Sequence, residues 1–428
     1  MIRNQKITKL SALLLMLLLL VTLAALGGCG KSEQATKSQR EYILIGRVNP
    51  ATGPLAGFGV GTPYIEEQAI EAINKDGGIY IAEYGKKLPI KLITVDSESN
   101  PTKASEAANK LILQDKVDLL ITASTVDTVN PVSAAAERHK IPCISVDAPG
   151  EAWLSGGPYK WSYHAFWKSK TQADVYIDTW DLLATNKKVG ILAPNDPEGL
   201  ALSQVIKEKA GARGYTVIDP GRFPMGTKDY TAIVNQFKNE GVDIIVGVMI
   251  TPDFATAWKQ FHQQGYVPKV VTMAKALLFP TDVAALGDDL GVGLTTEVWW
   301  TPLHPYKSSL TGQTSAELAK QWTEALGNKQ PTSPMGYKHA LVEIAVDVLK
   351  RAQSLDREKI REAIKATNLD TLVGHIQYDE QNFCETKLVA GQWKRGLAWP
   401  WETIITSNKK APEIPLSTEP MQYIPGSK

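Results

Sequence analysis

Two stretches of the chain repeat one pattern of apolar and polar positions. Between Val117 and Asn130, the acidic Asp118 precedes a short apolar run, which gives way to small polar residues and a new apolar-periodic run. The same order returns 125 residues later, between Val242 and Phe254. This order is typical of a buried parallel strand followed by a loop and a helix. Two copies predict two similar α/β lobes. Ligands of such sheets bind outside the carboxyl ends of the strands, so we expect the two loops to face each other across a cleft.

Strand-like and helix-like segments alternate along most of the chain, which predicts parallel sheets connected by helices. An aromatic segment at 153–167 interrupts the alternation, and the C-terminal part favours short antiparallel strands. The predicted strands are 42–47, 90–95, 119–122, 141–146, 189–192, 244–248, 270–273 and 293–300, followed by 375–378, 387–390 and 402–406. The predicted helices are 64–74, 102–114, 131–139, 172–183, 200–213, 231–240, 254–264, 315–326, 336–351 and 357–365.

The first 28 residues have the pattern of an export signal. Basic residues precede an apolar run from Leu10 to Leu26, which ends in Leu-Gly-Gly-Cys at Cys29. This run is shorter than the roughly 20 apolar residues that a transmembrane helix needs. The ending resembles a bacterial lipobox, in which cleavage leaves the cysteine as the lipid-modified first residue. We therefore expect lipidation of Cys29, membrane contact through this N-terminal lipid, and a polar tether at 29–41.

Length and charge narrow the classes of function. A chain of 428 residues is too long for one ordinary core and suits two domains. Without Arg3, Lys6 and Lys9 of the signal, 43 Lys and Arg residues stand against 45 Asp and Glu residues, a formal charge of −2. Nucleic-acid binding usually needs a basic patch, so we expect no nucleic-acid partner.

The sequence contains no arrangement typical of catalysis, metal binding or nucleotide binding. The glycine-rich loop at 57–61 does not fit G-x-G-x-x-G, and no Walker lysine follows it. Metal-binding histidine spacings, a CxxC pair and a G-x-S-x-G elbow are all absent. We therefore expect no metal, no cofactor and no enzymatic activity. Cys143 and Cys384 could pair in an exported protein, although the apolar run around Cys143 favours a buried free thiol. Acidic clusters such as Glu66-Glu67 are interpreted as solvated helix faces.

Candidate ligand-binding residues stand at predicted strand ends: Ser124, Thr125, Asp147, Glu198 and Asp253. Free N–H groups at helix N-termini favour an anionic ligand group, and carboxylates on the facing lobe favour an amine. A ligand with both charges would bridge the lobes. Ser124, Thr125 and Asp253 could instead cap helices. Aromatic residues near predicted loops could line a ligand pocket or simply pack in the core. They are Phe58, Trp153, Trp161, Tyr163, Trp167, Trp299 and Trp300.

Several short motifs follow one another in an order that resembles a known family. They are T-G-P-L-A-G-F-G at 52–59, I-N-K-D-G-G-I at 73–79, the segment 96–118, A-E-R-H-K-I-P-C-I-S at 136–145, K-D-Y-T at 228–231 and V-D-I-I-V at 242–246. From about Tyr42 to Thr406, the chain resembles a type I periplasmic binding protein of the leucine/isoleucine/valine-binding class. The resemblance implies an α/β fold with two Rossmann-like lobes, parallel sheets and three crossings between the lobes. It divides the chain into a signal peptide (1–28), a tether (29–41), lobe 1 (42–162 plus 278–375), lobe 2 (163–277 plus 376–410) and a C-terminal tail (411–428).

The resemblance also implies ligand-binding positions in the first lobe. Phe58 matches the aromatic residue that follows the T-G-P turn. Val126 stands where the family has a serine that meets the ligand carboxylate, with Ser124 and Thr125 just before it. Pro149 replaces a threonine of the family, which leaves the backbone around Asp147 and Ala148 to meet the ligand.

In the second lobe, Glu198 matches a tyrosine of the family, or Asp196 does if the loop is shifted by two residues. Asp253 matches the acid that binds the ligand amine. The lost hydroxyl groups weaken the case for a plain branched-chain amino acid. Glu198 beside Asp253 suits a more cationic or polyhydroxylated ligand, whereas the many aromatic residues suit an aromatic acid with Lys275 as its carboxylate partner.

The function that the resemblance implies is that of a receptor, exported and lipid-anchored to the outer face of the cytoplasmic membrane, on the periplasmic side or the cell surface. It would bind a small amino-acid-like or related polar metabolite and deliver it to an ABC permease in the membrane. Two alternatives stay open. One is a sensory ligand-binding protein that signals to a membrane receptor, and the other is a binder of aromatic acids in the same fold.

Overall fold

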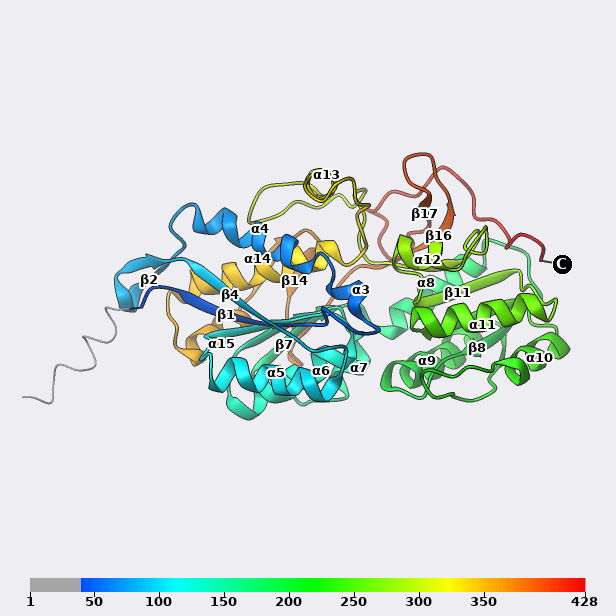
Figure 1. Ribbon diagram of the computed structural model, residues 1–428, viewed down its shortest axis with the longest axis horizontal. Helices are drawn as coiled ribbons and strands as arrows, with labels where there is room; N and C mark the ends of the chain where they lie inside the picture. Colours follow the sequence, from blue (N-terminus) through cyan, green and yellow to red (C-terminus); the bar gives the residue numbers. More distant parts are fainter. Residues whose placement is uncertain (1–39, 428) are drawn as a thin grey trace, which may run out of the picture.

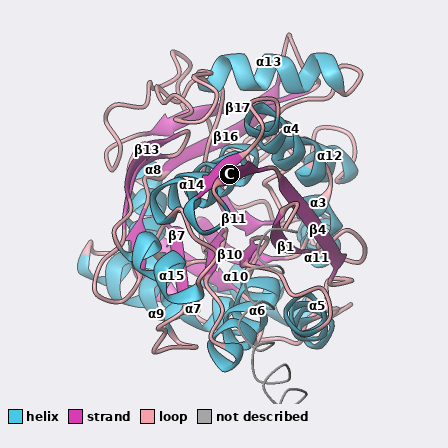
Figure 2. Cartoon of the chain, turned by 90° about the vertical axis from the view of Figure 1, so that its left-hand side faces the viewer, coloured by secondary structure: helices cyan, strands magenta, loops and turns pink. Residues whose placement is uncertain are grey.

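The computed structural model describes residues 40–427, which form two α/β lobes side by side along the long axis of the molecule (Figure 1). The predicted signal peptide and Cys29 lie outside the described residues. In the view along the long axis, helices surround the strands of the sheets (Figure 2).

The first lobe contains a sheet of six strands, all paired in parallel. Hydrophobic residues of two helices pack on one face of the sheet and those of two other helices pack on the opposite face. The strands in spatial order are β15 (Phe383–Glu385), β7 (Ser162–Phe166), β6 (Cys143–Val146), β5 (Leu119–Thr122), β1 (Ile43–Asn49) and β4 (Ile90–Asp96). One face carries α4 (Thr62–Asn74) and α14 (Met335–Ala352), and the other carries α5 (Pro101–Leu113) and α6 (Val126–His139).

The strand β5 shows why these strands are continuous apolar runs. Successive side chains of a strand point to opposite faces, and both faces of a parallel sheet are covered. Leu119 and Ile121 therefore pack in the core under α4 and α14, whereas Leu120 packs in the core under α5 and α6.

The second lobe contains a sheet of seven strands, five of them parallel and two antiparallel at one edge. The strands in spatial order are β17 (Trp401–Ser407), β16 (Val389–Arg395), β12 (Thr295–Val298), β11 (Val270–Lys275), β10 (Ile244–Met249), β8 (Lys188–Leu192) and β9 (Thr216–Ile218). One face carries α8 (Ser169–Trp180) and α9 (Pro197–Ala212), and the other carries α10 (Thr231–Glu240), α11 (Thr251–Gln263) and α12 (Pro280–Ala285).

The chain passes between the two lobes three times: from β7 to α8, from β12 to α14, and from β15 to β16. Helix α13 (Ser315–Ala325) lies within the second passage. The predicted α/β fold with two parallel-sheet lobes is therefore confirmed. The remaining elements are small: α3 (Ala56–Gly59), the hairpin of β2 (Ile79–Ile81) and β3 (Lys86–Leu88), η1 (Ala82–Tyr84), α7 (Gly150–Leu154), α15 (Arg357–Lys365), and the antiparallel pair β13 (Asn368–Thr371) and β14 (Gly374–Gln377).

The predicted lobe boundaries assign three strands to the wrong sheet. β7 and β15 extend the first sheet beyond β6, although 163–277 and 376–410 were assigned to lobe 2. β12 pairs with β11 and β16 in the second sheet, although 278–375 was assigned to lobe 1. Sheet membership follows the hydrogen-bonding partner of a strand, and nothing local in a short strand identifies that partner.

Local signals explain where the best-predicted helices start. Helix α13 begins at Ser315 because Thr314 and Glu317 form a capping box, in which Thr314 Oγ1 accepts a hydrogen bond from Glu317 N at 3.2 Å. Helix α6 begins at Val126, five residues before the predicted start at Pro131. Pro131 therefore lies inside the helix, and the prediction failed because it took the proline for a helix start.

Both cysteines within residues 40–427 are free and buried, so Cys143 and Cys384 do not pair. Of the helices that the structure describes, none combines the length and the apolar character of a membrane span.

Candidate functional site

Residues with left-handed backbone mark the carboxyl ends of three strands. Ser124 and Thr125 follow β5 with φ of 76° and 73°, Asp147 follows β6 with φ of 65°, and Lys275 ends β11 with φ of 61°. Such backbone is uncommon for residues other than glycine, and where it occurs it tends to gather at functional sites. The strand ends of both lobes thus carry the same feature where the two lobes meet.

A small cavity lies between the lobes at these strand ends. Five predicted binding residues line it together: Phe58, Thr125 and Asp147 from the first lobe, and Glu198 and Lys275 from the second. The other lining residues are Pro149, Phe166, Trp167, Glu297 and Trp299. We call this space the cleft cavity. It therefore combines carboxylates and a lysine with a wall of aromatic rings.

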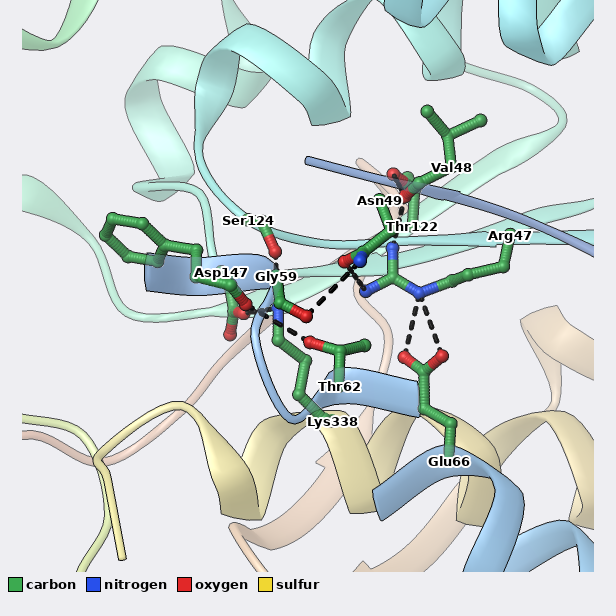
Figure 3. Close-up of polar contacts among 11 residues, drawn as sticks. Arg47, Val48, Asn49, Gly59, Thr62, Glu66, Thr122, Ser124, Asp147 and Lys338 are labelled. Atoms are coloured by element: carbon green, nitrogen blue, oxygen red, sulfur yellow. Dashed lines mark hydrogen bonds and ion pairs between the residues drawn. The ribbon is translucent and has the colours of Figure 1, made fainter. Parts of the chain in front are cut away.

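The first-lobe side of the cleft cavity is held by a buried ion pair between Asp147 and Lys338 of α14 (Figure 3). Lys338 Nζ also donates a hydrogen bond to Ser124 Oγ at 2.7 Å. The exposed fractions of the two charged side chains are 0% for Asp147 and 3% for Lys338. Burial raises the pKa of Asp147, although the positive charge of Lys338 acts to lower it. Burial likewise lowers the pKa of Lys338, although the negative charge of Asp147 acts to raise it. Asp147 Oδ1 is buried and has no hydrogen-bond partner among the described residues.

A second buried ion pair lies on the same side, between Arg47 of β1 and Glu66 of α4 (Figure 3). Arg47 Nε donates to Glu66 Oε1 at 2.8 Å and to Oε2 at 3.1 Å. Glu66 is only 1% exposed, so its interpretation as part of a solvated helix face is wrong. It is buried because α4 turns this side chain toward the guanidinium group of β1 and not toward solvent.

The second-lobe side carries an ion pair between Lys275 Nζ and Glu198 Oε2 at 2.6 Å. Burial raises the pKa of Glu198 to about 7, although Lys275 opposes this shift. Burial also works against the charge of Lys275, but the carboxylates of Glu198, Asp127 and Asp196 outweigh it and raise the pKa of Lys275. Asp127 belongs to α6 of the first lobe, so this lysine senses charge from both lobes.

Four of the predicted binding residues do not line the cleft cavity. Ser124 lies behind it, where its hydroxyl accepts a hydrogen bond from Lys338 Nζ. Val126 and Ala148 pack into an apolar cluster with Trp153 and Phe383. The Ala148 carbonyl accepts a hydrogen bond from His164 Nε2 at 2.7 Å.

The fourth is Asp253, which lines a neighbouring pocket together with Asp196 and Lys275. Its Oδ2 accepts a hydrogen bond from Gly226 N at 2.7 Å, so the carboxylate holds the loop before α10.

The alternative interpretation of the polar residues as helix caps is wrong for all three positions. Thr125 is the N-cap residue of α6, but its side chain makes no capping hydrogen bond. The Ser124 hydroxyl accepts from Lys338 instead. Asp253 lies within the first turn of α11, whose N-cap residue is Ile250.

The aromatic wall forms where the chain crosses between the lobes. Phe58 contacts Phe279 edge-on, with ring centroids 5.0 Å apart, and stacks on Trp299 at 6.1 Å. Phe166 meets Trp299 edge-on at 4.9 Å. Trp167 belongs to the first crossing and Trp299 to the second, so the rings pack across the joint between the lobes.

Sequence reasoning missed Lys338, Arg47 and Glu297. Lys338 could have been noticed as a lysine near the start of the helix predicted at 336–351, where the helix dipole favours acidic side chains. Its partner could not, because Asp147 precedes it by 191 residues. Within residues 40–427 there is no group of three or more His, Cys, Asp or Glu residues placed to hold a metal ion.

Comparisons with known proteins place this geometry in context. A family model described as "Periplasmic binding protein" matches residues 43–397. The Leu/Ile/Val-binding protein homolog 3 of Brucella melitensis is 24% identical over 340 residues, covering 79% of this chain and 87% of that relative. The crystal structure of a leucine binding protein, LivK, from Thermotoga maritima superposes with a TM-score of 0.72 at 20% identity, covering 84% of this chain and 97% of that one. A solute binding protein of an ABC transporter from Rhodopseudomonas palustris, in complex with 3,4-dihydroxy benzoic acid, gives a TM-score of 0.67 at 18% identity, covering 87% of this chain and all (100%) of that one.

Proposed function

The chain belongs to the periplasmic binding protein family, and from this premise we propose that it is the extracytoplasmic solute-binding lipoprotein of an ABC importer. Lipidation of Cys29 would anchor it to the outer face of the cytoplasmic membrane, and residues 29–41 would tether the lobes to that anchor. The lobes close on the ligand because the ligand binds the closed arrangement better than the open one, and the permease receives the closed form. Binding, not catalysis, is the proposed activity.

The observation that carries the proposal is the pairing of opposite charges across the cleft cavity. Lys275 supplies a cation from the second lobe, and Asp147 supplies a buried carboxylate from the first lobe whose Oδ1 has no partner among the described residues. A buried polar atom without a partner costs free energy that a ligand donor can restore. A small amino-acid-like ligand satisfies both sides, with its ammonium at Asp147 and its carboxylate at Lys275. Thr125, Glu198 and Phe58 complete the proposed contacts.

The aromatic wall favours a second candidate ligand, an aromatic acid with Lys275 as the partner of its carboxylate. Phe58, Phe166, Trp167 and Trp299 would then stack on the ligand ring or meet it edge-on. The Rhodopseudomonas palustris protein of similar fold was solved with such an acid.

A thermal-shift screen distinguishes these ligands. Purified protein is heated with branched-chain and cationic amino acids, simple amines and aromatic acids, and the bound metabolite that co-purifies is identified by mass spectrometry. An amino acid that raises the melting temperature supports the first candidate, whereas an aromatic acid supports the second. If no compound of these classes stabilises the protein or co-purifies with it, the proposed ligand class is wrong.

Lys275→Met is expected to weaken binding of the identified carboxylate ligand, as measured by calorimetry. A hydrogen bond to a charged group contributes about 1.5–3 kcal/mol, which corresponds to about 10- to 150-fold in affinity. Lys269→Met is the matched control. Lys269 does not line the cleft cavity, is partly exposed, and forms an ion pair with Asp243, with 3.1 Å between Lys269 Nζ and Asp243 Oδ2. Equal affinities of the two variants would remove Lys275 from the ligand site.

A further inference from the structure

A second and much larger cavity, of about 540 Å³, lies beside the cleft cavity. We call it the tryptophan chamber and define it by Val60, Phe279, Pro280, Trp322 and Trp401, which line it together with loop residues near Gln330. Val60 follows α3 of the first lobe, and Trp322 belongs to α13 of the second passage between lobes. Phe279 and Pro280 stand at the start of α12, and Trp401 begins β17 of the second lobe. Both lobes therefore contribute walls to the chamber.

The chamber has the size and chemistry of a small-molecule site. Ligand pockets in proteins usually measure about 300–1,000 Å³ and are mainly apolar with a few polar groups, and an apolar cavity of about 150 Å³ already holds benzene. Lys329, which is exposed, is the one charged residue among those that line the chamber. A charged ligand would lose its hydration there without a buried partner, so the chamber favours a neutral molecule.

Close packing holds the chamber walls in place. Gly61 has a left-handed φ of 82°, and an added Cβ there would come within 2.0 Å of the Trp322 ring. Gln330 Nε2 donates a hydrogen bond to the Trp401 carbonyl at 2.8 Å, which ties the loop before α14 to β17. The Arg395 guanidinium lies over the Trp401 ring, 4.1 Å from its centroid. The rings are thus positioned before any ligand arrives, which lowers the entropic cost of binding.

Phe58 and Phe279 separate the chamber from the cleft cavity. Their rings meet edge-on at 5.0 Å, and each is nearly buried. Phe58 lines the cleft cavity but not the chamber, whereas Phe279 lines the chamber but not the cleft cavity. A narrow space lined by both rings lies between them, so the two cavities adjoin but differ in chemistry, one charged and one apolar.

We propose that the tryptophan chamber is a second ligand site, which binds a neutral aromatic small molecule. The rings of Phe279, Trp322 and Trp401 provide the aromatic contacts. Because both lobes line the chamber, a bound molecule contacts both and favours their closed arrangement.

The test uses 4-fluoroacetophenone, a neutral aromatic ketone, whose binding is followed by broadening of its fluorine resonance. Ala284 of α12 lines the chamber, so Ala284→Trp should fill it. Ala285→Trp is the matched control, because Ala285 is also exposed but does not line the chamber. We expect saturable binding to the unchanged protein and to Ala285→Trp, and at least tenfold weaker binding to Ala284→Trp. Absence of saturable binding to the unchanged protein, or equal binding to both variants, overturns the proposal.

A second arm separates the chamber from the cleft cavity. Lys275 lines the cleft cavity but not the chamber, so Lys275→Met is expected to leave the affinity for 4-fluoroacetophenone within twofold of the unchanged value. A tenfold loss in this variant would place the ketone in the cleft and would overturn the chamber as a separate site. This outcome bears on the chamber alone, because the proposed transport ligand is tested by the thermal-shift screen.

Discussion

Lys338→Met tests whether the first-lobe side of the cleft depends on its buried ion pair. The variant removes the cation that pairs with Asp147 and donates to Ser124 Oγ at 2.7 Å, while keeping a side chain of similar length. Both charged side chains are almost fully buried, with exposed fractions of 3% and 0%. Removing one partner of such a pair leaves an uncompensated buried charge and costs about 3–5 kcal/mol of the free energy of unfolding.

The assay is urea unfolding followed by circular dichroism, with Lys103→Met as the control. Lys103 pairs with Glu98 on the surface, where both side chains are about half exposed, so its removal should cost less than about 1 kcal/mol. The double variant Lys338→Met/Asp147→Asn no longer buries an unpaired charge and should recover about half of the loss or more. A cost for Lys338→Met no larger than that of Lys103→Met, or a double variant as unstable as the single one, would refute the reasoning.

The loss of stability caused by Lys338→Met should depend on pH. Burial already raises the pKa of Asp147 in the folded protein, and loss of Lys338 raises it further. A group with a raised folded pKa contributes stability below its unfolded pKa, and this contribution is lost as pH rises through the folded value. The penalty of Lys338→Met should therefore be smaller at about pH 4 than at about pH 8, because a protonated Asp147 needs no cation. A penalty that does not change with pH would show that the charge of Asp147 is not its source.

Three further outcomes are expected. Gly61→Ala should lower the melting temperature, because its Cβ would clash with Trp322 at 2.0 Å and a φ of 82° disfavours alanine. Gly211→Ala is the control. It lies in α9 with no neighbouring atom within 4 Å of an added Cβ, and should raise stability by about 0.4–1 kcal/mol. A Gly61→Ala protein as stable as the unchanged one would contradict this packing. Glu198→Gln should remove a pH dependence, because the raised pKa of Glu198, about 7, makes its contribution to stability fall as pH rises from about 5 to about 8. The melting temperature of the unchanged protein minus that of Glu198→Gln should therefore decrease between about pH 5 and about pH 8. A constant difference would show that Glu198 does not titrate with a raised pKa. Asp253→Ala should leave stabilisation by an amine ligand unchanged, because this carboxylate binds Gly226 N at 2.7 Å outside the cleft cavity and the ammonium is proposed at Asp147. Loss of that stabilisation would instead place Asp253 in the ligand site.

Much of the site was within reach of sequence reasoning because it lies at strand ends. Thr125 and Asp147 stand in the loops that follow short strands, Lys275 ends another strand, and loops at the carboxyl ends of parallel strands meet at one edge of a sheet. The same reasoning failed for Val126 and Ala148, whose side chains turn into an apolar cluster. Direction within a loop depends on φ and ψ at single residues, and the left-handed backbone at Ser124 and Asp147 has no sequence signal of its own.

The sequence by itself determined the local elements and the fold class, because apolar periodicity, chain length and turn residues act over a few neighbours. Only the tertiary structure decided which distant residues meet. Lys338 reaches Asp147 across 191 positions, Glu66 turns inward to Arg47, and Val60 and Trp401 line one chamber. Such contacts depend on how helices and sheets pack together, and the chain records that packing in no single stretch of residues.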